Sequence, residues 1–91
     1  MTENEILAIL KMDLQISASQ YDTYLLNIIT LAKAAIAKEG ISLEENVEDG
    51  MLVEMYAAYL YRKRKSDNNA MPRSLRYALN NRLLSQKGIV T

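Results

Sequence analysis

The chain of 91 residues has no cysteine, no histidine and one proline, and its 11 acidic and 11 basic side chains cancel to a formal charge of zero. Because it lacks the usual thiol nucleophile, the usual acid–base side chain and a glycine-rich phosphate loop, we do not expect an enzyme, nor any catalytic residue, cofactor or metal site. No run approaches about 20 apolar residues, and the polar, acidic start does not resemble a signal peptide, so we expect no membrane span and no secretion signal.

The zero net charge conceals a division along the chain. Residues 1–54 carry ten acidic side chains and three lysines, whereas residues 55–91 carry eight basic side chains and one acid. The two parts therefore have charges near −7 and +7. Such a chain can place its acidic surface against the basic surface of a neighbouring copy, or turn its basic surface toward a polyanion such as DNA.

The size indicates one domain, residues 1–91, with a modest core, because a chain of 10.3 kDa hides only about 64% of its extended surface on folding. With 49% hydrophobic residues and no disulfide to add stability, association with other subunits is favoured. The absence of cysteine is compatible with the cytoplasm.

Apolar residues recur at helical spacing, so we predict an all-α bundle of about four helices. The first opens with a capping box over Thr2–Glu5 and is expected to be broken by Asp13 and Ser17–Ser19. It presents Ile6, Leu7 and Leu10 to the core.

The second predicted helix has the clearest apolar stripe. It starts near Ser19, where the side chain of Asp22 is placed to complete a capping box, and it ends at Gly40. The residues expected to face inward are Tyr21, Tyr24, Leu25, Ile28, Leu31, Ala32, Ala35 and Ile36. Thr23, Asn27, Thr30, Lys33 and Ala37 are expected to face outward.

The third predicted helix follows the acidic connector Ile41–Asn46, is capped by Asn46 with Asp49, and runs through Met51 to about Lys65. Its apolar residues extend almost around the cylinder: Leu52, Val53, Met55, Tyr56, Ala57, Ala58, Tyr59, Leu60 and Tyr61. Such a helix is either central in the domain or buried by another subunit.

A polar loop, Ser66–Asn69, leads to a fourth helix with Pro72 at its first position and with Leu75, Leu79 and Leu83 inward. We expect the tail after Gly88 to be loose.

Two charged clusters stand out. The acids around the start of the third helix, Glu44, Glu45, Glu48 and Asp49, suit the positive end of its dipole, with a cation site as the alternative. The run Arg62–Lys65 either complements the opposite end of that dipole or joins Arg73, Arg76, Arg82 and Lys87 in one basic surface for a partner. Tyr61 and Tyr77 are freer to stack there than Tyr56 and Tyr59.

The order of elements carries a resemblance over nearly the whole chain. A short helix leads into Leu10–Asp13, a long second helix follows, an apolar third helix ends in Tyr61-Arg62, and a polar loop leads through Met71-Pro72 to a leucine-containing helix. This resembles the head–tail connector proteins of tailed bacteriophages, often described as head-completion or DNA-packaging proteins. Residues 85–88, Ser-Gln-Lys-Gly, are similar to the Gln-Leu-Arg-Gly ending of the branch from phages and prophages of Gram-positive bacteria.

The resemblance implies a non-enzymatic structural subunit that forms a ring of about a dozen copies in the virion, at the head–tail junction. Such a ring docks beneath the portal protein, extends the DNA channel, and supports a tail-completion protein after packaging; assembly takes place in the host cytoplasm. Packaged DNA would slide through without sequence-specific contacts.

A ring needs two different patches that meet between copies. We predict that the subunit interface contains Glu44, Glu45, Glu48, Glu54, Leu60, Tyr61, Arg62 and Arg64. The competing hypothesis keeps the interface apolar and turns Lys63, Lys65, Arg73 and Arg76 toward DNA in the channel. The alternative function is a small helical nucleic-acid-binding or regulatory protein of a prophage, although Ser66–Met71 is long and glycine-free for the turn of a helix-turn-helix.

Overall fold

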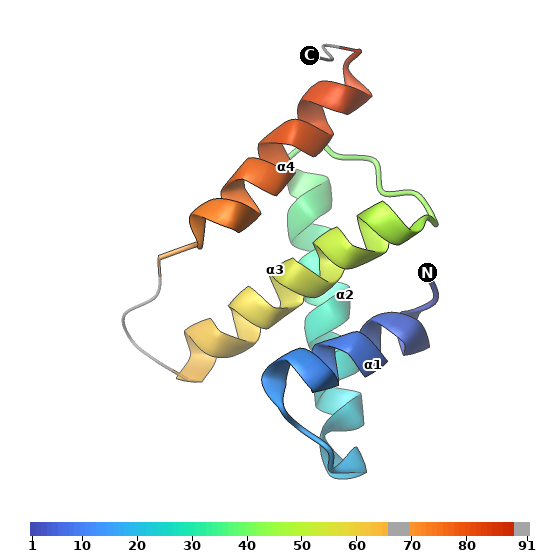
Figure 1. Cartoon of the computed structure of the whole chain (residues 1–91), viewed down its shortest axis with the longest axis vertical. Coiled ribbons are helices and arrows are strands. Elements are labelled where there is room, and N and C mark those ends of the chain that lie inside the picture. The colour runs from blue at the N-terminus through green and yellow to red at the C-terminus, as the bar shows by residue number, and fades with distance from the viewer. Residues whose placement is uncertain (66–69, 89–91) are drawn as a thin grey trace.

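The structure is a computed structural model that describes residues 1–65 and 70–88. It contains helix α1 (Glu3–Leu14), a 3₁₀ turn η1 (Ser19–Tyr21), and helices α2 (Asp22–Lys38), α3 (Val47–Lys65) and α4 (Arg73–Gln86), with no strand among the described residues (Figure 1). The predicted all-α class and the small bundle of four helices are confirmed. The expected polar loop over Ser66–Asn69 and the tail after Gly88 lie outside the described residues.

Helix α1 begins as its sequence predicts but continues past Asp13, where a break was expected, to Leu14. The hydroxyl of Thr2 accepts a hydrogen bond from the Glu5 amide at 3.1 Å, and the Thr2 amide donates to the Glu5 carboxylate at 2.8 Å. This reciprocal pair is a capping box. Gln15 then leaves the helix in the left-handed region, with φ at 59°, and the predicted core residues of α1 are buried.

Helix α2 starts differently from the prediction. The carboxylate of Asp22 returns no bond to the helix start; it accepts one at 2.7 Å from Lys11 Nζ of α1. The end of the helix agrees, because Gly40 has a φ of 94°, which glycine adopts without strain. Much of the predicted inward stripe is buried, but the buried face is turned toward Ile29, which is fully buried, whereas Tyr21, Tyr24 and Leu31 are 45%, 39% and 52% exposed.

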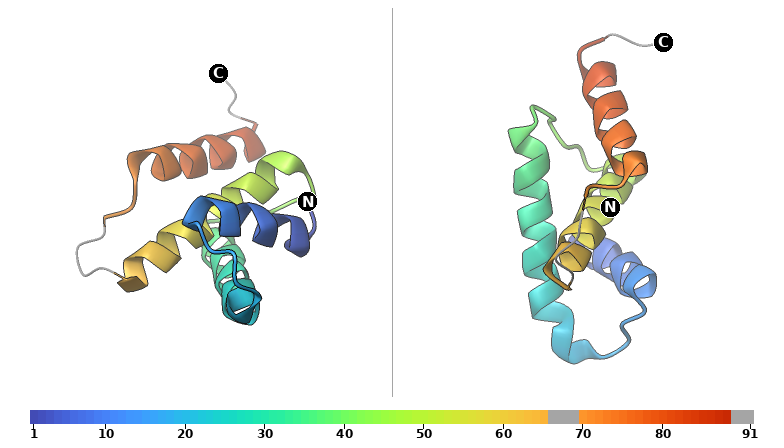
Figure 2. Two further views of the ribbon diagram at one scale, coloured as in Figure 1. Left: turned by 60° about the horizontal axis from the view of Figure 1, so that its bottom comes forward. Right: turned by 90° about the vertical axis from the view of Figure 1, so that its left-hand side faces the viewer.

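Helix α3 is the centre of the fold. Asn46 caps it as predicted, accepting a hydrogen bond from the Asp49 amide at 2.7 Å. The helix runs diagonally between α1 and α4 and crosses in front of α2 (Figures 1 and 2), and it contacts all three helices. The apolar residues around α3 are therefore covered largely by helices of the same chain. Those that are buried are Leu52, Val53, Tyr56, Ala57 and Ala58, and those that are half-buried are Met51, Met55, Tyr59, Leu60 and Tyr61.

Helix α4 is the outermost helix. Pro72 lies at its N-cap, one position before the predicted one, with φ at −59°. Leu75 and Leu79 are buried as predicted, and Leu83 is half-buried. Because few of its side chains reach the core, α4 depends on polar contacts for its position.

Candidate functional site

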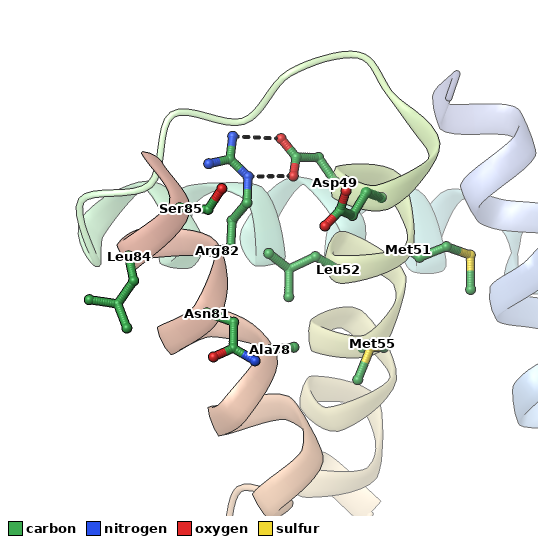
Figure 3. A pocket seen from close by; sticks show the side chains of 10 residues that line it. Asp49, Met51, Leu52, Met55, Ala78, Asn81, Arg82, Leu84 and Ser85 are labelled. Atoms are coloured by element: carbon green, nitrogen blue, oxygen red, sulfur yellow. Dashed lines mark hydrogen bonds and ion pairs between the residues drawn. The ribbon is translucent and has the colours of Figure 1, made fainter. Parts of the chain in front are cut away.

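The strongest of these contacts joins Arg82 of α4 to Asp49 of α3. Arg82 Nε and Nη2 donate to the two carboxylate oxygens of Asp49 at 2.7 and 3.0 Å (Figure 3). Nη2 also donates to the Ser42 carbonyl at 2.8 Å, and Asp49 accepts a further bond from the Glu44 amide at 2.8 Å. The Arg82 guanidinium holds the pKa of the buried Asp49 carboxyl below its usual range. Each oxygen of the Asp49 carboxylate therefore accepts a hydrogen bond from Arg82.

A second set of contacts ties α4 to the end of α2. Arg76 Nη1 and Nη2 donate to the two oxygens of Glu39 at 2.9 and 3.0 Å, and this bidentate pair lowers the pKa of Glu39. Further along α4, the Gln86 side chain donates to the Gly40 carbonyl at 2.7 Å and accepts from the Ser42 amide at 2.6 Å. The end of α2 and the start of the connector between α2 and α3 are therefore both bound to α4.

Much of the charge division found in the sequence is neutralised inside the chain. Arg82 and Arg76, from the basic part, pair with Asp49 and Glu39, from the acidic part. Arg62 also lies 3.5 Å from Asp13 of α1. Three arginines of the basic part thus help to hold the helices of one chain together.

One of the predicted site residues needs correction. Glu54 is 3% exposed, so it lies beneath the surface and cannot belong to an exposed acidic patch. Its position on α3, which packs against α1, explains the burial. Arg76 was expected to face DNA; its guanidinium binds Glu39 of the same chain while its side chain stays 42% exposed, so this role stays a prediction.

An apolar groove lies between the first half of α3 and the second half of α4. Its volume is about 560 Å³, and Figure 3 shows Leu52 reaching from α3 toward α4 inside it. The residues that line it are Glu48, Asp49, Met51, Leu52, Met55, Ala78, Asn81, Arg82, Leu84 and Ser85. Glu48, which lines it, is exposed, and so are Glu44 and Glu45 in the connector that leads to α3; Glu44 reaches Arg82 at 3.9 Å. We call the groove with these three carboxylates the acid-rimmed groove.

A basic surface lies at the opposite end of α3. Three cations of the run cover tyrosine rings, namely Lys63 over Tyr59 at 5.7 Å, Arg64 over Tyr24 at 6.0 Å and Lys65 over Tyr61 at 5.4 Å. Tyr24 and Tyr61 also contact each other edge to face, with centroids 6.4 Å apart. We call these six residues the basic–tyrosine surface. Each exposed cation–π contact contributes about 0.5–1 kcal/mol, enough to restrain a lysine or arginine without neutralising it.

The remaining predicted residues divide between these surfaces. Glu44, Glu45 and Glu48 belong to the acid-rimmed groove, whereas Tyr61, Lys63, Arg64 and Lys65 belong to the basic–tyrosine surface. Leu60 is half-buried near that end of α3, and Arg73 is exposed at the start of α4. On α3 the groove is lined by residues 48–55 and the basic–tyrosine surface occupies residues 59–65, so their centres are about 16 Å apart along the helix axis.

The sequence reasoning missed the apolar part of the groove. Met55 was counted among the apolar residues of α3, but Met51 and Leu84, which also line the groove, were assigned to no surface. Leu84 lies outside the stripe of Leu75, Leu79 and Leu83 and remains 42% exposed, and a large apolar residue off the buried stripe is the signal that would have identified it.

Within the described residues, no three metal-binding side chains of the His, Cys, Asp or Glu type form a cluster that could hold an ion. No helix among them has the length and apolar character needed to cross a bilayer. Comparison with models of known protein families, with curated proteins and with solved structures finds no match for this chain.

Proposed function

We propose that this chain is a non-enzymatic structural subunit of a phage head–tail connector, which assembles as a ring beneath the portal protein, continues the DNA channel and supports tail attachment after packaging. The observation that carries the proposal is the pair of opposite charged surfaces at the two ends of α3, each with apolar or aromatic surface beside it. The order of helices described in the sequence analysis supports it.

In this proposal, the acid-rimmed groove of one copy receives the basic–tyrosine surface of the next. The two patches differ, and a contact between different patches produces a ring when the rotation closes. Methionine side chains such as Met51 and Met55 adapt to the shape of a partner. Among the described residues, no ion pair joins Lys63, Arg64 or Lys65 to a carboxylate, so their charges remain available to Glu45 and Glu48 of a neighbour.

The experiment uses two charge-reversal variants of the full chain. Lys63→Glu with Arg64→Glu disables the basic–tyrosine surface, and Glu45→Lys with Glu48→Lys disables the acid-rimmed groove. Each variant alone should fail to assemble, because its groove and its basic surface then carry charges of the same sign. An equal mixture should assemble again, because native surfaces pair with native ones and reversed surfaces with reversed ones. Sedimentation velocity at low salt, alone and with a portal protein, measures the mass. Lys38→Glu, an exposed charge reversal at the end of α2, is the matched control.

The natural absence of cysteine permits a second measurement. Leu84→Cys and Arg64→Cys place one thiol in each surface. A chain carrying both substitutions should cross-link into a ladder of oligomers, whereas a mixture of the two single variants should give a dimer. A wild-type chain that stays monomeric at high concentration and on the portal protein would contradict the proposed function.

A second candidate, a small helical nucleic-acid-binding or regulatory protein, is favoured by one observation. The three cations of the basic–tyrosine surface are held beside aromatic rings, an arrangement that suits phosphates and stacked bases. Titration of the monomer with several unrelated DNA sequences separates the two candidates. Nanomolar preference for one sequence supports a regulator, whereas weak and sequence-indifferent binding that falls steeply with salt agrees with a channel.

A further inference from the structure

The carboxyl group of Glu54 is enclosed where α1 packs on α3. The residue is 3% exposed, and its Oε2 atom is buried without a hydrogen-bond partner among the described residues. A carboxylate in this position loses its hydration and receives little in return. The neutral acid, which carries a proton to donate, fits the site better.

The surroundings of Glu54 contain a second carboxyl group. Asp13, near the end of α1, lies within hydrogen-bonding reach of Glu54. Arg62, on the same helix as Glu54, lies 3.5 Å from Asp13, and its side chain is 55% exposed. Two acids, one of them buried, thus have one partly solvated arginine beside them.

Asp13 and Arg62 are the titratable groups that act on Glu54. Elsewhere in the contact of α1 with α2, Lys11 is paired with Asp22 at 2.7 Å, so that lysine is already engaged. Burial, followed by the hydrogen bond and negative charge of Asp13, raises the pKa of Glu54 from 4.5 to about 7, and Arg62 opposes this rise.

We propose that Glu54 and Asp13 form a proton-dependent latch between α3 and α1, which is closed while Glu54 donates its proton to the Asp13 carboxylate and is loosened when Glu54 ionises. Ionisation places two negative charges side by side in a site that water reaches poorly. The chain has no histidine, so a buried carboxyl pair supplies the response to pH near neutrality. This latch is independent of the proposed assembly.

The direction of the effect follows from proton linkage. Because the pKa of Glu54 is about 7 in the folded chain and 4.5 when the group is exposed, the folded chain binds the Glu54 proton more tightly than the opened chain does. This difference acts between pH 4.5 and about pH 7. The closed state is therefore fully favoured below pH 4.5, loses stability as the pH rises through this range, and changes little above it. For a single proton, the equilibrium between closed and open α1 shifts by at most about tenfold for each pH unit.

The first test is a carbon NMR titration of the Glu54 side-chain carboxyl in the full chain. We expect a midpoint near 7 in the wild type and a lower one in Asp13→Asn, where the negative neighbour is absent. Glu45→Gln, which changes an exposed glutamate, is the control variant and should leave the Glu54 midpoint unchanged. A Glu54 midpoint below pH 5 in the wild type, or no shift in Asp13→Asn, overturns the latch.

The second test follows hydrogen exchange of the α1 amides, expressed as protection factors so that the intrinsic pH dependence of exchange is removed. Protection should fall from pH 5 to pH 7 in the wild type and in Glu45→Gln. It should stay level in Glu54→Gln, whose amide cannot ionise. If Glu54→Gln loses the same protection over this range, Glu54 is not the sensor. Should Glu54→Gln fail to fold, the two titration midpoints decide the question.

Discussion

Arg82 and Asp49, 33 positions apart, form a two-point ion pair of 2.7 and 3.0 Å that fastens the outermost helix to the central one. Their side chains are 13% and 2% exposed, so water competes weakly for either partner. Arg82 also binds the Ser42 carbonyl, which makes it the point where α4, the connector and the start of α3 meet. The shape of the acid-rimmed groove therefore depends on one arginine.

Replacing this arginine should destabilise the chain strongly. Arg82→Ala leaves the buried Asp49 carboxylate without its partner, a change that costs about 3–5 kcal/mol in comparable sites. Urea denaturation followed by circular dichroism measures the loss. Arg73→Ala, which removes an exposed arginine from the first turn of α4, should change the free energy of unfolding by less than about 0.5 kcal/mol. Equal effects of the two substitutions would contradict the role given to Arg82.

Neighbouring residues on α2 should respond very differently to truncation. Ile29 is fully buried, so Ile29→Ala should cost about 2–5 kcal/mol. Leu31 is half-exposed, and Leu31→Ala should cost less than about 1 kcal/mol. Thermal unfolding of both variants decides between the observed orientation of α2 and the rotated one that the sequence favours. A larger loss for Leu31 would support the rotated one.

This contrast shows which parts of the fold can be read from the sequence. Thr2, Asn46 and Gly40 act on backbone groups within a few residues, so helix ends follow from local chemistry. The orientation of α2 does not, because Leu31 is as apolar as Ile29, the Tyr24 ring is also largely apolar, and only packing against α1 and α3 selects the buried side.

The same limit applies to the candidate site. Charge counting identified two opposite parts of the chain, but not that Arg76 and Arg82 would be bound by Glu39 and Asp49 of the same subunit. A pair separated by more than 30 positions depends on where the helices pack. The burial of Glu54 was hidden for the same reason, since a glutamate on a helix is usually exposed.

Any side chain added at Gly40, in the left-handed turn after α2, should lower the free energy of unfolding. Gly40 has a φ of 94°, and the nearest atom to an added Cβ would be Leu83 Cδ1 at 3.7 Å, so the strain is conformational and not a clash. We expect Gly40→Ala to lower the free energy of unfolding by about 1–2 kcal/mol. Gly40→Asn should lower it less, because asparagine enters this region more easily. Denaturant midpoints of the two variants check the order, and a neutral Gly40→Ala would refute it.

The free energy of unfolding should pass through a maximum near pH 5. On the acid side, Asp49 and Glu39 have pKa values lowered by their arginines. The stability that these two ionised groups add is therefore fully present at a pH above their ordinary pKa values, and it is lost as the pH falls through the lowered pKa values. On the alkaline side, Glu54 acts in the opposite sense, because its raised pKa of about 7 makes its contribution decline between 4.5 and 7. Each group changes the stability by at most about 1.4 kcal/mol per pH unit.

Urea denaturation at intervals from pH 3 to pH 8 measures this curve. Glu54→Gln should keep the loss in acid and remove the loss between pH 5 and 7, which turns the maximum into a plateau. Asp49→Asn should remove part of the acid limb and leave the alkaline limb in place, although it starts from a lower stability because a charged partner of Arg82 is gone. A wild-type curve that keeps rising from pH 5 to 7 would show that Glu54 is already ionised in the folded chain.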